Sequence, residues 1–143
     1  MRSHINSLEQ NVQLKEQTID RTKESKVDVS KEIVKGHLSS FLDNNLEAVM
    51  SDYMNESVLI TQGATYTGFE EIRVFFVGLI MHFPKQKSNF VLDKLAANND
   101  LVYIVWHAHT PSLQVPIGSD TFIIKDSKIY QQTFVGQLNF INQ

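Results

Sequence analysis

The sequence of 143 residues contains no cysteine, only 3 prolines and one tryptophan, Trp106. The absence of cysteine excludes disulfides, thiolate nucleophiles and thiolate metal ligands, and it fits a reducing compartment. No apolar run approaches the length of a membrane span, and the first residues lack the apolar core of a signal peptide. The sequence therefore predicts a soluble cytoplasmic protein with no membrane partner.

Positive charge is also scarce, because 13 Lys and Arg stand against 16 Asp and Glu, which gives a net charge of -3. Nucleic-acid binding rests largely on contacts between cations and phosphates, so we expect no nucleic-acid partner. The chain has no phosphate loop, dinucleotide fingerprint or nucleophile elbow. His107, His109 and Asp120 carry possible metal ligands, but their spacing matches no known metal site. We therefore predict neither a cofactor nor a metal.

The composition that remains is that of a globular protein, with 42% hydrophobic and 20% charged residues. The length suits one domain with a proper core. Residues 1–28 contain no aromatic residue, glycine or proline, and they predict a helical or flexible extension. Residues 29–143 form the predicted domain, whose first helix is expected to begin near Ser30, a favourable N-cap.

The order of predicted elements indicates the fold class. Apolar residues at helical spacing are followed by segments rich in β-branched and aromatic residues. Helices before a run of antiparallel strands are typical of an α+β protein, in which helices cover one face of a sheet. We predict helices near 30–42, 46–53 and 67–83, and strands near 58–62, 88–97, 101–110, 115–125 and 128–137.

A hairpin over residues 115–135 contains the first candidate functional residue. Asp126 and Ser127 favour a turn between its two arms. Asp120 shares one face of the first arm with Phe122 and Ile124, so alternation points a carboxyl group toward the apolar side. A buried acid is costly unless it is paired, hydrogen-bonded or protonated. Asp120 is therefore either an acid/base group or a structural hydrogen-bond acceptor.

Two histidines in the predicted strand 101–110 share one face with Tyr103 and Val105. If this face is the concave one, His107 and His109 lie near Asp120, where an imidazole would modulate the acidity of the carboxyl group. The opposite face carries Trp106 and would form a subunit interface, in which Trp is a frequent anchor.

A third histidine lies in the apolar stripe of the first predicted helix. His37 is four residues from both Ile33 and Phe41, so it faces the same side as they do. It is either a group that reaches a pocket or a satisfied core residue, since polar groups in apolar surroundings mark functional sites only in part of the cases.

The order of elements and two segments, 58–76 and 118–130, resemble the nuclear transport factor 2-like (cystatin-like α+β) superfamily. The resemblance is greatest to its SnoaL-type polyketide cyclase and ketosteroid isomerase branches, and it covers about residues 33–138. It implies a conical α+β barrel, in which N-terminal helices pack on a curved, mostly antiparallel sheet around a pocket. Because one fold hosts many functions, the resemblance says less about the reaction than about the fold.

Residue by residue, the resemblance implies a role for Asp120. This residue matches the oxyanion-hole Asp of the isomerases and the single acid/base Asp of the cyclases. His37 falls where the isomerases have a Tyr. The position of the isomerase base falls at Thr61 or Gln62, and neither can take a proton from carbon at neutral pH. Steroid isomerisation is therefore disfavoured.

These observations predict a small-molecule-binding protein with an apolar pocket. As an enzyme it would be a cofactor-independent isomerase, cyclase or hydratase that uses Asp120 as general acid/base, with His37 as a second donor and His107 or His109 as a partner. Its ligand would be a small apolar or polycyclic molecule, and it would form a homodimer through the face with Trp106. The predicted pocket residues are Phe41, Tyr53, Thr61, Phe75, Phe76, Leu79, Tyr103, Val105, His109, Phe122, Tyr130, Gln132 and Phe134.

The alternative is a non-catalytic module of the same fold that binds a ligand or serves dimerisation and assembly. The volume of the pocket discriminates between the two. A cavity of roughly 300 Å³ or more that holds Asp120 favours a ligand, whereas a cavity filled by aromatic side chains favours assembly.

Overall fold

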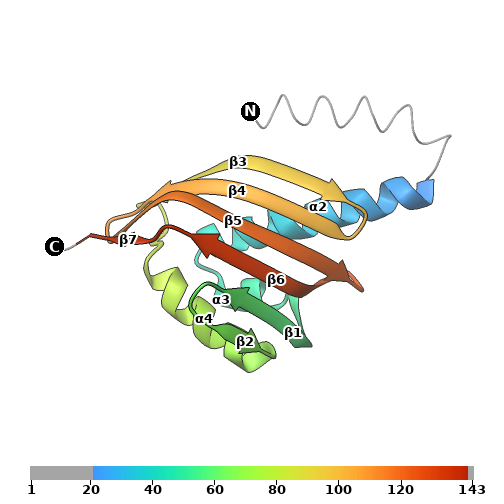
Figure 1. Ribbon diagram of the computed structural model, residues 1–143, viewed down its shortest axis with the longest axis horizontal. Helices are drawn as coiled ribbons and strands as arrows, with labels where there is room; N and C mark the ends of the chain where they lie inside the picture. The colour runs from blue at the N-terminus through green and yellow to red at the C-terminus, as the bar shows by residue number, and fades with distance from the viewer. Residues whose placement is uncertain (1–20, 142–143) are drawn as a thin grey trace.

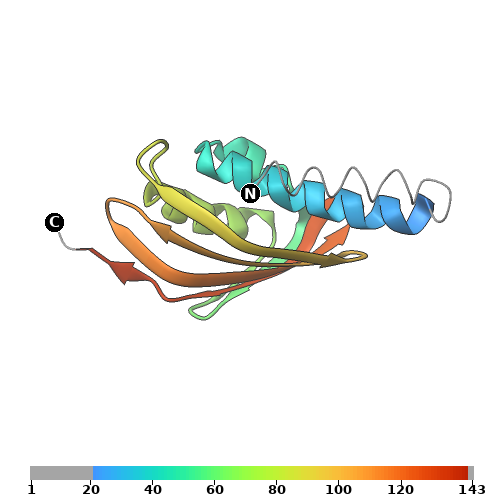
Figure 2. The same ribbon diagram turned by 90° about the horizontal axis from the view of Figure 1, so that it is seen from above.

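The computed structural model describes residues 21–141, with side chains from Lys26 onward. Helices lie on one side of a curved sheet, in the α+β arrangement that the sequence predicts (Figures 1 and 2). The described helices are α2 (Arg21–Leu42), α3 (Leu46–Met50) and α4 (Phe69–Met81). The described strands are β1 (Tyr53–Thr61), β2 (Thr65–Thr67), β3 (Asn89–Asn98), β4 (Leu101–His109), β5 (Leu113–Lys125), β6 (Lys128–Gly136) and β7 (Asn139–Phe140).

The sheet has the strand order β2-β1-β6-β5-β4-β3, and the short β7 pairs with β5. Only β1 and β6 pair in parallel; the other described pairs are antiparallel. The predicted curved and mostly antiparallel sheet is thus confirmed. Its two ends, β2 and β3, do not meet, so the sheet is an open curved layer and not a closed barrel (Figure 2).

Helix α2 begins earlier than the sequence predicts. It runs without interruption from Arg21 to Leu42, so Ser30 lies inside the helix and is not its N-cap. Ser30 is buried, and its hydroxyl donates to the carbonyl oxygen of Asn99 at 2.8 Å. The expected boundary at residue 29 therefore falls within a helix, and residues 1–20 of the predicted extension lie outside the described residues.

The predicted hairpin is present as β5 and β6. Asp126 and Ser127 have φ angles of 52° and 60°, and two successive left-handed residues form the type of turn that suits a two-residue hairpin. Each strand of this hairpin also contains an irregularity of pairing. One lies in β5 near residues 116–117, and the other lies in β6 at Tyr130. Such bulges change which face the following side chains occupy.

Candidate functional site

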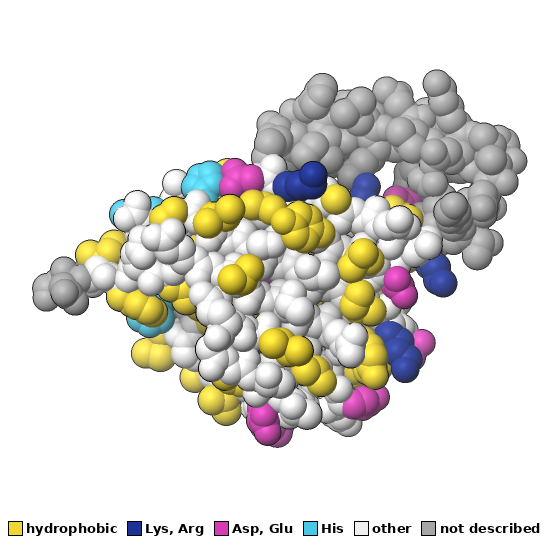
Figure 3. Space-filling view, viewed as in Figure 1, with side chains coloured by type: hydrophobic (Ala, Val, Ile, Leu, Met, Phe, Trp, Pro, Cys, Tyr) yellow, Lys and Arg dark blue, Asp and Glu magenta, His cyan; other side chains and the backbone are white. Residues whose placement is uncertain are grey.

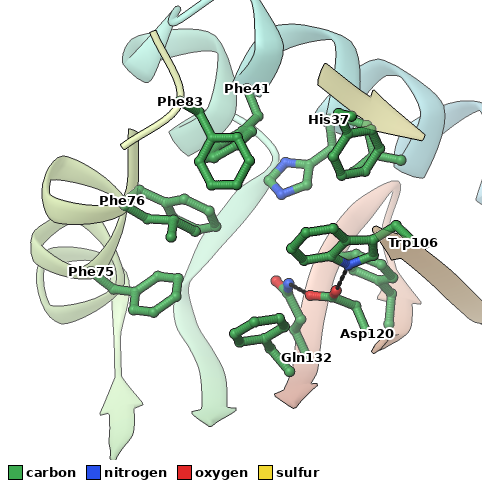
Figure 4. A pocket seen from close by; sticks show the side chains of 13 residues that line it. His37, Phe41, Phe75, Phe76, Phe83, Trp106, Asp120 and Gln132 are labelled. Atoms are coloured by element: carbon green, nitrogen blue, oxygen red, sulfur yellow. Dashed lines mark hydrogen bonds between the residues drawn. The ribbon is translucent and has the colours of Figure 1, made fainter. Parts of the chain in front are cut away.

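A cavity of about 50 Å³ lies between α2, α4 and the concave face of the sheet (Figure 4). Most of its walls are aromatic or aliphatic, and its polar lining groups are His37, Asp120, Gln132 and the indole N–H of Trp106. Its lining residues are His37, Leu38, Phe41, Phe75, Phe76, Leu79, Phe83, Phe90, Trp106, Asp120, Phe122, Gln132 and Phe134.

The carboxyl group of Asp120 is held by two donors. The indole Nε1–H of Trp106 donates to Oδ1 at 2.8 Å, and the side-chain amide of Gln132 donates to Oδ2 at 2.9 Å (Figure 4). The residue is 8% exposed. Burial raises the pKa of Asp120 to about 6, while the two hydrogen bonds and the charge of His37 act in the opposite direction. Asp120 therefore changes its charge close to neutral pH.

The position of Trp106 depends on the glycine beside it. Trp106 on β4 is paired with Gly118 on β5, and a Cβ atom at residue 118 would lie 2.6 Å from two carbon atoms of the indole. The indole also stacks on Phe90 and on Phe134, with ring centroids 5.1 and 5.9 Å apart. A side chain at residue 118 would displace the ring, so glycine is what lets Trp106 reach Asp120.

Gln132 continues the hydrogen bonds away from Asp120. Its Oε1 accepts from the hydroxyl of Tyr53, and this hydroxyl is 3.2 Å from Nε2 of His37. All three side chains are buried, with exposed fractions of 5%, 4% and 2% in that order. Burial, followed by the charges of Asp120 and Asp52, raises the pKa of Tyr53 well above its usual value. Tyr53 is therefore a neutral phenol that donates one hydrogen bond.

The second ring nitrogen of His37 faces an acid that reaches the surface. Nδ1 of His37 is 2.9 Å from Oδ2 of Asp52, in the turn between α3 and β1. The side chain of Asp52 is 25% exposed and that of His37 is 3% exposed. The cavity carboxyl group is thus connected through buried side chains to a partly exposed one.

Most predicted pocket residues lie around the cavity. His37 and Asp120 line it, and Tyr53 lies behind them as a link in the hydrogen-bond chain. Both nitrogens of His37 have protein partners, so His37 is a member of this chain and is not free to donate to a ligand in this arrangement. The other predicted residues that line the cavity are Phe41, Phe75, Phe76, Leu79, Phe122, Gln132 and Phe134.

The prediction for strand β4 requires a correction, because its two faces are exchanged. Ile104, and not Val105, pairs with Asp120 and shares its inward face. A shift of one residue exchanges the two faces of a strand. The bulge near residues 116–117 hides this register from the sequence. Trp106 is therefore buried beside Asp120 and does not stand on the outer face as a dimer anchor.

The outer face of β4 carries the residues that we expected in the pocket. They are Tyr103, Val105, His107 and His109, none of which lines the cavity. The side chain of His107 is 46% exposed, and its Nδ1 lies 2.7 Å from Oδ2 of Asp93. His107 therefore has no contact with Asp120.

Two further predicted pocket residues also lie elsewhere. The hydroxyl oxygen of Thr61 accepts from the backbone N–H groups of Gly63 and Ala64, in the turn after β1. Tyr130 has the same parity as Gln132, but the bulge at this position turns it away, and its ring lies 4.8 Å from Nζ of Lys125. Neither residue lines the cavity.

Sequence reasoning missed Asp52 and four lining residues. The sequence offered only a partial signal for Trp106, a glycine in the next predicted strand, because a large flat ring needs a small neighbour there. No sequence signal connects Asp52 with His37, since 15 residues and a short helix separate them. The missed lining residues are Leu38, Phe83, Phe90 and Trp106.

Within residues 21–141, no group of three or more His, Cys, Asp or Glu residues is placed to hold a metal ion. No helix in this part of the chain is long and apolar enough to cross a membrane.

Comparison with models of protein families found no match, and neither did comparison with curated proteins. Solved structures do match. An NTF2-like protein of unknown function from Cytophaga hutchinsonii has a TM-score of 0.64 at 9% identity, over 76% of this chain and 89% of the other. A protein from Kribbella flavida with the provisional name ketosteroid isomerase has a TM-score of 0.65 at 8% identity, over 82% and 84%.

A third structure is that of SalBIII, an epoxide hydrolase/cyclase-like enzyme of pyran ring formation in polyether salinomycin. Its TM-score is 0.66 at 15% identity, over 78% of this chain and 95% of the other. At such low identities the similarity shows the fold alone. The fold is that of the NTF2-like proteins, as the resemblance in the sequence implies.

Proposed function

We propose that this protein binds a small, largely apolar molecule in the cavity and that Asp120 exchanges a proton with it as general acid/base. The reaction would be a cofactor-independent isomerisation, cyclisation or hydration. The observation that carries the proposal is a single carboxyl group, 8% exposed, in a cavity with aromatic walls. Its pKa of about 6 makes both the acid and the base form accessible near neutral pH.

The surroundings of Asp120 support this role. Trp106 and Gln132 fix the orientation of the carboxyl group, and such fixed geometry is what general acid/base catalysis requires. The names of two structural neighbours, ketosteroid isomerase and epoxide hydrolase/cyclase-like enzyme, denote isomerisation and cyclisation, which are reactions of the proposed kind. Because these neighbours are 8% and 15% identical, their names are consistent with the proposal but do not carry it.

The volume of the cavity limits the size of the ligand. Pockets for drug-sized ligands have volumes of about 300–1,000 Å³, and this cavity has about 50 Å³. A polycyclic molecule of the kind predicted from the resemblance would enter only after aromatic walls such as Phe75, Phe76 and Phe83 had moved. We therefore propose a compact ligand with one oxygen atom that approaches Asp120.

Deuterium exchange tests the proposal without a known substrate. Small cyclic ketones, such as cyclopentanone and cyclohexanone, are incubated with the protein in D₂O, and loss of the α-proton signals is followed by NMR. Exchange above the buffer rate is expected, and Asp120→Asn should abolish it while the fold is retained. Exchange at the buffer rate, together with no ketone-induced change in Trp106 fluorescence, would contradict the proposal.

The second candidate function, a dimerisation or assembly module, is favoured by the small cavity and by the outer face of the sheet. Hydrophobic side chains are exposed at several places on this face (Figure 3). They include those of Tyr103, which is 39% exposed, and Val135, which is 57% exposed. Tyr103→Lys combined with Val135→Lys should convert a dimer to a monomer in sedimentation velocity. A wild-type protein that sediments as a monomer at micromolar concentrations would reject this candidate.

A further inference from the structure

Six side chains from α2, the turn before β1 and four strands form one continuous chain of hydrogen bonds. Five of them are at most 8% exposed, and only Asp52 reaches the surface, with a side chain that is 25% exposed. In order, the members are Asp52, His37, Tyr53, Gln132, Asp120 and Trp106. Buried polar groups of this kind must satisfy one another, because water is not available to them.

The partners of Asp120 fix the directions of the hydrogen bonds at the cavity end of the chain. The indole of Trp106 has no acceptor and the amide nitrogen of Gln132 only donates, so both oxygens of Asp120 accept. The amide oxygen of Gln132 only accepts, so the hydroxyl proton of Tyr53 points toward it.

The direction of these hydrogen bonds determines the protonation state of His37. Tyr53 has one hydroxyl proton, which Gln132 receives, so the phenol oxygen can only accept from Nε2 of His37. Nδ1 of His37 faces a carboxylate oxygen of Asp52 and donates to it. In this direction both ring nitrogens carry a proton, which makes His37 an imidazolium ion.

The opposite direction of these hydrogen bonds is also self-consistent, but it requires Asp120 to be protonated. If His37 is neutral, its Nε2 accepts from Tyr53, and the amide of Gln132 turns by 180° so that its oxygen faces Asp120. That oxygen is satisfied only when Asp120 is protonated and donates to it. The chain thus links an imidazolium with a carboxylate, or a neutral imidazole with a carboxylic acid.

We propose that Asp52 is a positioning residue that holds His37 as an imidazolium and, through Tyr53 and Gln132, maintains Asp120 as a carboxylate. This inference rests on the proposed function, and it assigns the direction of the first step. Asp120 begins as the base and accepts a proton from the bound molecule, which leaves the carboxylic acid to return that proton later.

Few ionisable groups face Asp120, so a change in its titration can be traced to a single residue. Among the lining residues only His37 and Asp120 have ionisable side chains, and no Lys or Arg lines the cavity from α2, α4 or the strands. Tyr53 and Asp52 lie behind His37. The charge of His37 lowers the pKa of Asp120 through space, against the effect of burial.

The single tryptophan supplies a measurement that does not depend on activity. In the full-length ¹⁵N-labelled protein, the one indole N–H signal belongs to Trp106, which donates to Asp120. Its chemical shift should follow the protonation of Asp120, with a midpoint near pH 6. Asp120→Asn should abolish this titration.

The test compares variants at the surface end of the chain. Asp52→Asn removes the charge that stabilises the imidazolium, so the midpoint should rise by about half a unit to one unit. His37→Gln should raise it as well. Asp93→Asn is the matched control, because it alters an Asp–His pair on the outer face and should leave the midpoint unchanged.

A double variant distinguishes the hydrogen-bond chain from a through-space charge effect. Tyr53→Phe interrupts the chain, so adding Asp52→Asn to it should give little further shift. An unchanged midpoint in both Asp52→Asn and His37→Gln would overturn the inference, as would a full shift in the Tyr53→Phe background. Failure of the ketone exchange would instead contradict the proposed function and would leave this titration unaffected.

Discussion

Two Asp–His pairs of similar geometry lie on opposite sides of the sheet. The pair of His37 and Asp52 has an N···O distance of 2.9 Å, and the pair of His107 and Asp93 has one of 2.7 Å. The histidine side chain is 3% exposed in the first pair and 46% exposed in the second. By the N···O distance alone, the outer pair would be the stronger interaction. Burial and onward hydrogen bonds are what distinguish the inner pair as part of a site.

The difference has an energetic consequence. Water and salt screen the outer pair, and exposed pairs contribute at most about 1 kcal/mol. In the inner pair, removal of one partner leaves a buried polar or charged group without compensation, which is strongly destabilising. Substitution in the inner pair should therefore lower stability strongly and shift the titration of Asp120. Substitution in the outer pair should change stability little and leave that titration unchanged.

The largest expected effect is that of Asp52→Ala on stability. The free energy of unfolding should fall by about 3 kcal/mol at pH 7, at the lower end for a broken buried pair because Asp52 is partly exposed. Urea denaturation followed by circular dichroism measures it. Asp93→Ala is the control and should cost less than about 1 kcal/mol. Equal losses in the two variants would remove the distinction between the pairs.

A comparable effect is expected from Asp120 as pH changes. The pKa of Asp120 is raised from 3.8 to about 6 on folding, so between these values the folded state binds more protons than the unfolded state. The contribution is therefore unfavourable at neutral pH, and stability is lost as pH rises through this window. A shift of this size corresponds to about 3 kcal/mol.

Denaturation at pH 4 and pH 7 of the wild type and of Asp120→Asn isolates this contribution. The difference in unfolding free energy between the two proteins should change in the stated direction between these pH values. A difference that is independent of pH would show that Asp120 has an ordinary pKa in the folded protein. Asp93→Asn provides the comparison on the outer face.

A smaller effect on stability is expected on the inner face of the sheet, where Gly118 packs against Trp106. Gly118→Ala places a methyl group 2.6 Å from the Trp106 ring, and overpacking of this kind costs about 1–3 kcal/mol. The indole should also move from Asp120, which the emission of this single tryptophan reports. Unchanged stability and emission would show that glycine is not needed here.

The smallest effect is expected one residue before His37, on the exposed side of the same helix. A Cβ atom at Gly36 meets no atom within 4 Å, so Gly36→Ala should raise the unfolding free energy by about 0.5–1 kcal/mol. The indole titration should stay unchanged. A shift of the midpoint would indicate that a change on the exposed side of α2 reaches Asp120 on its buried side, which we do not expect.

Parts of this arrangement could be predicted from the sequence because they depend on local periodicity. The inward direction of Asp120 follows from its alternation with Phe122, and the hairpin turn follows from Asp126 and Ser127. The helical stripe of α2 likewise places His37 toward the sheet. These features need only a few neighbouring residues.

Features that depend on pairing between distant residues could not be predicted. The bulge in β5 shifts the register against β4, so Trp106 replaces His107 beside Asp120. Asp52 reaches His37 only because the turn after α3 returns the chain to α2. No local pattern encodes either contact, since each depends on how separate elements pack.

The protonation of Asp120 tests the central claim most directly. NMR of the protein labelled with ¹³C at aspartate carboxyl carbons, with Asp120→Asn for assignment, gives the pKa of this group in the folded state. A value near 6 is predicted, and it should rise in Asp52→Asn but not in Asp93→Asn. A value near 3.8 in the wild type would contradict an acid/base role for Asp120 near neutral pH.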